Sequence, residues 1–270
     1  TRTLESRRDR IMTMLITPFM SCSARLPVYI LLESAFFPVN QGLILLSVYL
    51  IGILLAIGTS FLLKKTLFAK SSDPFVMELP PYRMPTMRNT TIHMWGKAGQ
   101  YLKKMGTIIL FASILIWALG YFPLNRTTMA DETEHLENSY IGQIGKAIEP
   151  VIRPLGFDWK MGVSIVTGLA AKEIVVSSMG ILYHVPDAEE NSQSLIESLQ
   201  QQQYSNGQKV FTPLVAYGFM LFILIYFPCM AVIAAIRKEA GWKWALFTIF
   251  YTTGLAWLVS FGVYQIGSLF

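Results

Sequence analysis

The sequence predicts an all-α fold, a polytopic bundle of transmembrane helices. Of its 270 residues 53% are hydrophobic and only 14% are charged, whereas about a quarter are charged in ordinary soluble domains. Crossing roughly 30 Å of hydrocarbon takes about 20 apolar residues. Four runs without a charged residue reach that length: Gly42–Leu63, Met105–Leu124, Val210–Ile236 and Trp244–Phe270.

Two further apolar segments, Ile11–Phe37 and Met161–Tyr183, are interrupted by charged residues. The first contains TPFMSCSARLPVY, with two prolines, a cysteine and an arginine, and proline breaks or kinks a helix. When Cys22 is aligned with Cys229, a cysteine and a nearby proline interrupt a long apolar segment in both places, and an uncharged run follows. Two broken-helix repeats of this kind, here expected to be inverted, are a recurring design of transporters.

The segments between the apolar runs differ in charge. Basic residues outnumber acidic ones by four to two in 1–10, by eight to two in 64–104 and by three to one in 237–243. The balance reverses to three against six in 124–158 and to one against four in 184–209. The positive-inside rule places the first three segments in the cytoplasm and the other two outside. The rule also explains the net charge of +5, which therefore does not indicate nucleic-acid binding.

This topology puts both flanks of Met161–Tyr183 outside. The segment then re-enters the membrane without crossing it, or the charge rule fails there, because acidic residues contribute little to orientation.

Cys22 and Cys229 are the main candidate ligands. Thiolates are soft ligands suited to late first-row metals, and a broken helix frees carbonyls that must face protein or a wet cavity. Pro18 precedes Cys22 and Pro228 precedes Cys229, which predicts two places where a sulfur and carbonyl oxygens meet a cation. A single free cysteine is more often a small buried hydrophobe, and the pairing in a repeat favours the ligand role.

Met20 and Met230 flank the two cysteines. Their thioethers are further candidate ligands, although packing is the commoner role of methionine.

Lys172 and Glu173 lie in the apolar segment Met161–Tyr183 among small residues. Intramembrane charges are costly and usually face the bundle interior or a water-filled path. We therefore expect a pore or gate role, with Glu173 as a further candidate ligand, and the alternative is a structural ion pair. Adjacent helix positions point about 100° apart, so each residue needs its own partner.

Arg25 and Glu33 are eight residues apart on roughly one face of the first broken segment. Arg25 is expected either to snorkel or to cap the freed carbonyls. Glu33 is expected to be solvated near the outer end and is given no role.

The sequence shows no motif of a known catalytic site. It has no G-x-x-x-x-G-K-[ST] loop, no H-E-x-x-H and no G-x-S-x-G, and an enzyme is not expected. His93, His135 and His184 fall in loops or at interfaces without metal-ligand spacing.

Three stretches resemble the bacterial ferrous iron transport protein B (FeoB) family. They are TPFMSCSARLPVYILLESAFFP from Thr17, GLAAKEIVVSSMGILY from Gly168 and YFPCMAVIAAIRKEAGWKWA from Tyr226. In that family two gate regions, distantly shared with nucleoside permeases, form the proposed iron path. The resemblance implies that Cys22 and Cys229 are gate cysteines and that Lys172 and Glu173 belong to the second gate. Pro18, Arg25, Pro27 and Pro228 would shape the breaks.

The resemblance, together with the charge pattern, divides the chain into five parts. They are the second part of the first gate region (1–68), a cytoplasmic connector with an interfacial helix (69–104), a transmembrane helix (105–124), an external segment with an amphipathic helix (125–158) and the second gate region (159–270) with a polar loop at 184–209.

The implied function is gated passage of Fe²⁺ through the bacterial cytoplasmic (inner) membrane, as the permease part of an uptake transporter. No tightly bound cofactor is expected, and GTP and Mg²⁺ would act only through the GTPase domain that precedes the gates in the family. That domain, its spacer and the start of the first gate are not in this sequence, so the chain alone would not be a complete transporter. The implied partners are the lipid bilayer, the GTPase domain, small cytoplasmic accessory proteins of the Feo system and a second copy of the chain.

Two alternatives remain at this point. A permease for a nucleoside or another solute would use the same gates without depending on the cysteines. A non-transporting membrane subunit would only bind partner proteins.

Overall fold

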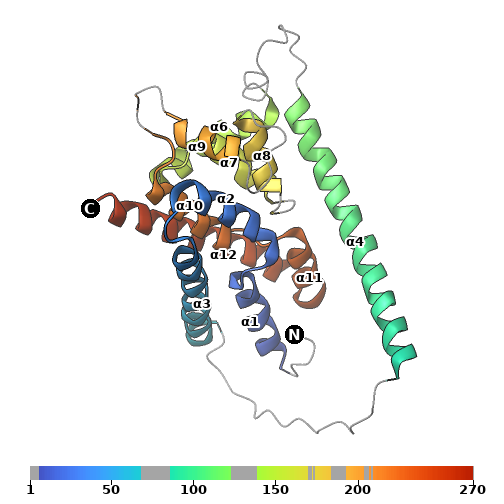
Figure 1. Cartoon of the computed structure of the whole chain (residues 1–270). Coiled ribbons are helices and arrows are strands. Elements are labelled where there is room, and N and C mark those ends of the chain that lie inside the picture. Colours follow the sequence, from blue (N-terminus) through green and yellow to red (C-terminus); the bar gives the residue numbers. More distant parts are fainter. Residues whose placement is uncertain are drawn as a thin grey trace.

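The computed structural model describes residues 6–67, 86–122, 139–169, 172, 174–183, 193–203, 207 and 209–269. These residues are helical, with turns between them and one isolated antiparallel bridge, Gln203–Lys209. Three segments of the described chain are long and apolar enough to cross a membrane, namely Arg7–Phe36, Gln41–Thr66 and Trp242–Gly267. The predicted all-α membrane bundle is confirmed (Figure 1).

The first broken segment consists of two short helices separated by two turns of 3₁₀ helix. In order these are α1 (Arg7–Ile16), η1 (Thr17–Phe19), η2 (Ser23–Arg25) and α2 (Leu26–Phe36). Pro18 and Pro27 lie in the first turn of η1 and of α2, where the missing N–H costs nothing. Cys22 lies between the two 3₁₀ turns with an extended backbone (φ −108°, ψ 161°), so the helix is interrupted where the sequence predicts.

The second broken segment has the same plan. α10 (Pro213–Ile225) ends at Tyr226, whose backbone is extended with ψ at 173°, and α11 (Met230–Ala240) begins directly after Cys229. A helix of 26 residues follows each broken segment: α3 (Gln41–Thr66) and α12 (Trp242–Gly267).

Both 26-residue helices turn a stripe of mostly small side chains towards the interior. The buried positions recur every three or four residues: Val48, Gly52, Ala56, Thr59 and Leu63 in α3, and Ala245, Thr248, Thr252, Ala256 and Ser260 in α12. Small residues let helix backbones approach closely in membranes. The shared pattern supports the internal repeat.

The segment 161–183 is a helical hairpin. α7 (Trp159–Thr167) and α8 (Ile174–Leu182) have nine residues each, about half the length needed to cross a bilayer. The hydroxyls of Thr167 and Ser178 lie 2.9 Å apart, although eleven residues of straight helix would separate them by about 16 Å. The chain therefore turns back on itself, as the re-entrant alternative predicts.

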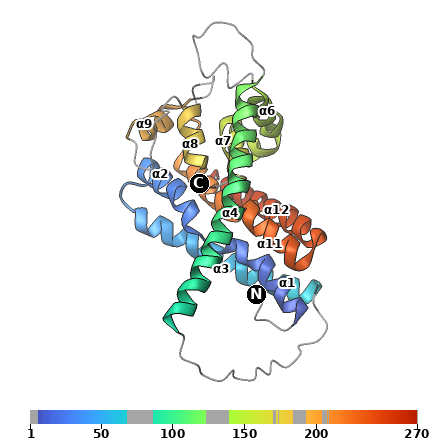
Figure 2. The same cartoon turned by 90° about the vertical axis from the view of Figure 1, so that its right-hand side faces the viewer.

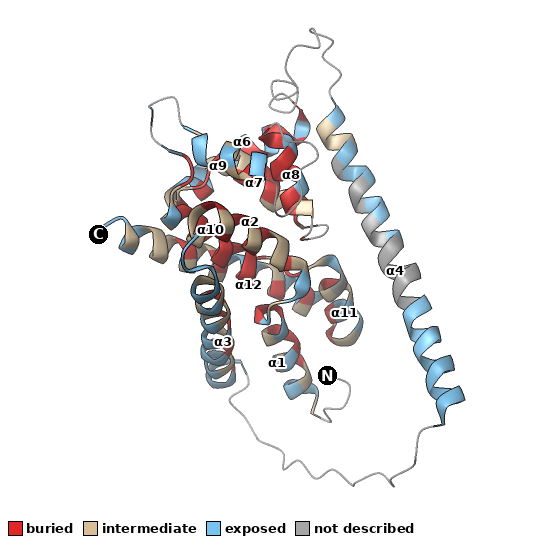
Figure 3. Ribbon diagram, viewed as in Figure 1, coloured by how far each residue is buried: buried red, intermediate tan, exposed pale blue. Residues whose placement is uncertain are grey.

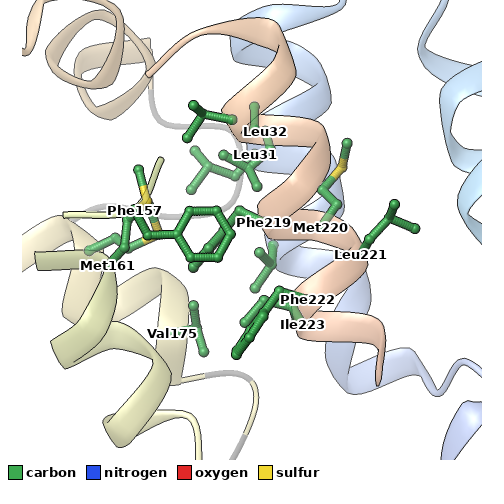
Figure 4. Close-up of a cluster of buried hydrophobic side chains, with 14 of the residues drawn as sticks. Leu31, Leu32, Phe157, Met161, Val175, Phe219, Met220, Leu221, Phe222 and Ile223 are labelled. Carbon is green, nitrogen blue, oxygen red and sulfur yellow. The ribbon is translucent and has the colours of Figure 1, made fainter. Parts of the chain in front are cut away.

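The core lies where α2, α10 and the α7–α8 hairpin meet. Figure 4 shows Leu31 and Leu32 of α2 and Met161 and Val175 of the hairpin on the same side of α10, near Phe157 and Phe219. Phe157, just before α7, makes edge-to-face contacts with Phe219 and Phe222 at centroid distances of 5.4 and 5.7 Å. Buried residues concentrate in α2 and α10, whereas α3 and α4 are mainly exposed on their outer faces (Figure 3).

The connecting helices differ in part from the expectations. α4 (Met87–Tyr121) passes without a break through the positions predicted as an interfacial helix and a transmembrane helix. It stands to one side of the bundle in Figure 1 and crosses in front of it in Figure 2. α6 (Tyr140–Ile152) with η3 (Arg153–Leu155) is the predicted amphipathic helix. It buries Ile141 and Ile152 and leaves Val151 59% exposed.

α9 (Gln193–Gln201) was not predicted. It lies inside the polar segment 184–209 and buries Leu195 and Leu199 completely. Residues 69–85 of the predicted connector lie outside the described residues.

Candidate functional site

Three interruptions of regular helix meet in one region. They are the η1–η2 break, the α10–α11 break and the turn between α7 and α8, which carries Lys172. The Lys172 ammonium donates a hydrogen bond of 3.4 Å to the Ile223 carbonyl, near the end of α10. α10 also packs against η1 of the first break. The two breaks that carry Cys22 and Cys229, 207 residues apart in the sequence, therefore lie close together.

Arg25 is buried and closes the first break. Its Nη2 donates to the Pro18 carbonyl at 2.9 Å and its Nη1 donates to the Met20 carbonyl at 3.2 Å. The planar guanidinium provides several donors in fixed directions, so one side chain satisfies two carbonyls that the interrupted helix leaves free. Arg25 therefore caps the freed carbonyls, as one of the two predicted roles requires. The carbonyls of Pro18 and Met20 were expected to face a cation, but in this structure they bind Arg25 instead.

Lys172 is 3% exposed and lies at a turn rather than within a helix. Its Nζ is 3.2 Å from the centroid of the Tyr226 ring, a cation–π contact of the kind that gains strength when water is excluded. The Tyr226 hydroxyl in turn donates to the Ile165 carbonyl of α7 at 3.4 Å. The hairpin is therefore held against the second break from both sides of its turn.

Gly168 allows the turn of the α7–α8 hairpin to lie directly against Tyr226. A methyl group at this position would meet the Tyr226 hydroxyl and would lie 2.6 Å from Val175 Cγ2. Only glycine leaves the room for the hairpin to turn directly on the tyrosine.

The sulfur atoms lie at the edge of this cluster. Cys22 is exposed and Cys229 is partly exposed, and the side chains of Met20 and Met230 are 59% and 41% exposed. Within the described residues no group of three or more His, Cys, Asp or Glu side chains is placed to hold a metal ion. Glu173 lies outside the described residues.

Glu33 is buried, with 5% of its surface exposed, so the expectation of a solvated carboxylate is wrong. Sequence reasoning also assigned no role to Tyr226 or Tyr29. A usable signal was present, because Tyr29 and Glu33 follow Arg25 at intervals of four residues and so share its helix face.

Of the histidines, His93 is exposed on α4, and His135 and His184 lie outside the described residues.

The arrangement brings two sulfurs and two buried cations together at a double helix break. A soft, divalent cation can be bound by the sulfurs. The Arg25 guanidinium and the Lys172 ammonium repel such an ion as long as they stay in place.

Comparisons with known proteins identify the family. A family model described as Gate: Nucleoside recognition matches residues 102–243, which is more than half of the chain. The chain belongs to this Gate family. A second model, described as Ferrous iron transport protein B C terminus, matches residues 45–97. The Gate match includes the α7–α8 hairpin and the α10–α11 break, and it overlaps the predicted second gate region over 159–243.

Individual relatives support the same resemblance over the whole chain. An Fe(2+) transport protein A/Fe(2+) transporter FeoB fusion protein of Porphyromonas gingivalis is 50% identical over 100% of this chain and 36% of its own length. Proteins named Fe(2+) transporter FeoB from Methanocaldococcus jannaschii and Staphylococcus aureus are each 40% identical over 100% of this chain, and the chain covers 39% and 38% of their lengths. No solved structure matches. The resemblance to the FeoB family is confirmed, and the chain spans less than half of each of these relatives.

Proposed function

We propose that this chain is the permease part of a ferrous iron uptake transporter and that Fe²⁺ passes between its two broken helices. The observation that carries the proposal is the proximity of the two breaks: α10 packs against η1, Lys172 contacts Tyr226 and the Ile223 carbonyl at the second break, and Arg25 binds the freed carbonyls of the first break. Broken helices facing each other near the middle of the bundle are where transporters bind their substrates. The relatives that match the whole chain are named as Fe²⁺ transporters, which favours iron over a nucleoside.

The two cations act as the closed gate in this proposal. Fe²⁺ binds the sulfurs only after Lys172 leaves the Tyr226 ring and Arg25 releases the carbonyls of Pro18 and Met20. The released carbonyls then become ligands beside the thiols. Such binding by a few ligands at a time is weak enough for the ion to leave again, as conduction requires.

The gate is opened, we infer, by the remainder of the full-length protein. A GTPase domain that binds GTP and Mg²⁺ would supply this control, and this chain would itself carry no catalytic step and no tightly bound cofactor. The fusion of an Fe(2+) transport protein A segment in the P. gingivalis relative supports a small accessory protein as a partner. The three candidate spans fit a multi-pass protein of the cytoplasmic membrane, and association with a second copy belongs to the same proposal.

The test is anaerobic uptake of radioactive iron by cells that lack their own ferrous system. The cells carry the full-length protein, either native or with Cys22→Ser and Cys229→Ser together, at equal abundance in the membrane. Uptake by the native protein and at least a tenfold loss in the double variant are expected. Equal uptake by both would remove the thiols from the path. A Met20→Leu, Met230→Leu variant measures separately whether the thioethers contribute.

The same cells are assayed with a radioactive nucleoside. Uptake of the nucleoside without uptake of iron would show that the Gate resemblance, and not the resemblance to FeoB, describes the substrate.

A further inference from the structure

A row of polar side chains runs along the first broken segment. Arg25, at the start of α2, is followed at intervals of four residues by Tyr29 and Glu33, and residues four apart lie on the same side of a helix. Ser21 precedes Arg25 by four residues and lies in the break itself. From Arg25 to Glu33 the row covers about 12 Å at the helical rise of 1.5 Å per residue.

Each member of the row has a buried polar atom without a hydrogen bond of ordinary geometry. The atoms are Ser21 Oγ, Arg25 Nε, Tyr29 OH and Glu33 Oε1, and they are four of only seven such atoms among the described residues. The Ser21 and Tyr29 hydroxyls interact with each other, which leaves Arg25 Nε and Glu33 Oε1 without a partner. Leaving a buried polar group unpaired costs about 1–3 kcal/mol, and native proteins contain few of them. Two such atoms beside two buried hydroxyls therefore indicate a feature built for a polar ligand.

The burial of the row excludes a simpler explanation. Tyr29 is fully buried, and Arg25 and Glu33 are 3% and 5% exposed, so bulk water at the protein surface does not satisfy these atoms. Leu31 and Leu32 on the other faces of α2 are also fully buried and pack in the apolar core. The polar face and the apolar faces of α2 are thus both internal, which is unusual for a helix that serves only as packing.

One end of the row lies at the break beside Cys22, and the other end lies next to α9. Its inner end, Ser21, precedes Cys22 in the break, where Arg25 binds the freed carbonyls. Its other end, Glu33, lies in the last turns of α2, where Gln200 of α9 donates a hydrogen bond to the Ala35 carbonyl. The acidic segment 184–209, which contains α9, is one of the two segments that the positive-inside rule places outside.

We propose that this row lines the outer half of the ion route and that Glu33 is its entry ligand for a divalent cation; this inference rests on the proposed function. The carboxylate attracts the hydrated cation. The Tyr29 oxygen replaces part of its water along the way, as pore-lining oxygens do in selective channels. Arg25 then stands between the ion and the sulfur of Cys22, so the row leads from a negative entrance to a positive gate.

The first test compares two isosteric changes in the full-length protein. Glu33→Gln removes the charge and preserves the shape, and we expect at least a tenfold fall in the initial rate of iron uptake at limiting iron. The matched control is Glu197→Gln on the neighbouring helix α9, where Glu197 is exposed, and this variant is expected to transport at the native rate. Native uptake by Glu33→Gln would overturn the entry role.

The second test does not require transport. In a Cys22→Ser, Cys229→Ser background, single cysteines at Glu33 and at Tyr29 are labelled from outside with a charged, membrane-impermeant methanethiosulfonate reagent. We expect labelling at least tenfold faster than at Leu31→Cys or Leu32→Cys, and slower labelling of Tyr29→Cys, which keeps Glu33, when Mn²⁺ is added. Labelling as slow as at the two leucines would show that water does not reach the row, and this result would overturn the proposal.

The two tests separate the inference from the proposed function. If cysteines in the row are labelled rapidly and protected by Mn²⁺ while the native protein takes up no iron, the route stands and the iron function fails. If iron is taken up while the row is unlabelled, the function stands and the route fails.

Discussion

The Lys172 ammonium lies 3.2 Å from the centroid of the Tyr226 ring, so the tip of the α7–α8 hairpin is bound directly to the residue at which α10 ends. Buried cation–π contacts are worth about 2 kcal/mol. The contact therefore contributes a substantial part of the energy that keeps the hairpin on the second break.

A double-mutant cycle measures this contact. We expect Lys172→Met and Tyr226→Leu to show a coupling of about 2 kcal/mol in the free energy of unfolding in detergent. Tyr226→Phe keeps the ring, loses only the bond to the Ile165 carbonyl, and is expected to retain most of the coupling to Lys172. A coupling within about 0.5 kcal/mol of zero would show that the ammonium and the ring do not stabilise each other.

Arg25 is expected to be the main stabilising residue of the first break. Its two hydrogen bonds to backbone carbonyls come from a charged donor, and each such bond contributes about 1.5–3 kcal/mol. Arg25→Met keeps the aliphatic stem and should lose about 3 kcal/mol or more. Arg25→Lys should lose less, because a single ammonium keeps the charge but cannot reproduce the planar fork.

The control for Arg25 is Arg153→Met, at an exposed position of η3. Exposed substitutions usually change stability by less than about 0.5 kcal/mol, and thermal unfolding of the three variants gives the comparison. Equal effects of Arg25→Met and Arg153→Met would contradict the capping role.

A side chain at position 168 is expected to destabilise the folded protein. A Cβ there would lie 2.6 Å from Val175 Cγ2 as well as against Tyr226, and overpacking of this kind costs about 1–3 kcal/mol. We expect Gly168→Ala to lower the unfolding midpoint and to be partly rescued by Val175→Ala. Gly254→Ala in α12 has open space around it and should be neutral or stabilising, because alanine is the better helix former.

The sequence predicted the features that depend on local chemistry. Proline is disfavoured in a helix interior, and both breaks could be placed from Pro18 and Pro228, although Pro150 lies inside α6. The break between α7 and α8 has no proline, and only the charges of its flanks indicated that the chain turns back. What makes that turn is the fit of Gly168 against Tyr226, a contact between distant parts of the sequence.

Features set by tertiary packing were missed. α9 was missed because its two buried leucines, Leu195 and Leu199, stand in a segment rich in glutamine and serine. Glu33 was expected in water, and its burial depends on packing that the sequence of α2 does not reveal. The sequence could not predict the partners of Lys172 for the same reason, since neither Ile223 nor Tyr226 is near it in the sequence.

Asp158 gives the structure a pH-dependent element outside the three candidate spans. It precedes α7 and its Oδ1 accepts a hydrogen bond of 2.9 Å from the Met161 N–H. Burial raises the pKa of this carboxyl from 3.8 to about 6. Because the pKa is higher in the folded state, the contribution to stability is present below about pH 4 and is lost as the pH rises through 6.

The comparison for Asp158 is Asp158→Asn, which keeps an acceptor at the N-cap and does not titrate. A pKa that is about two higher in the folded than in the unfolded protein corresponds to about 3 kcal/mol. The native protein should therefore lose about 2–3 kcal/mol of stability relative to the variant between about pH 4 and pH 7, measured by chemical unfolding across that range. Parallel stability curves for the two proteins would show that Asp158 titrates normally.

The hairpin predicts that the two flanks of 161–183 lie on the same side of the membrane. Gln143 of α6 and Glu197 of α9 are both exposed and stand before and after the hairpin. In a background with Cys22→Ser and Cys229→Ser, single cysteines at these positions should be labelled by an impermeant maleimide from outside, whereas a cysteine at Lys64 should be labelled only after the cells are opened. Outside labelling at Gln143 together with cytoplasmic labelling at Glu197 would mean that the segment crosses the membrane, and the re-entrant topology would be wrong. Labelling of both from the cytoplasm would keep the hairpin and reverse the orientation that the charges predict.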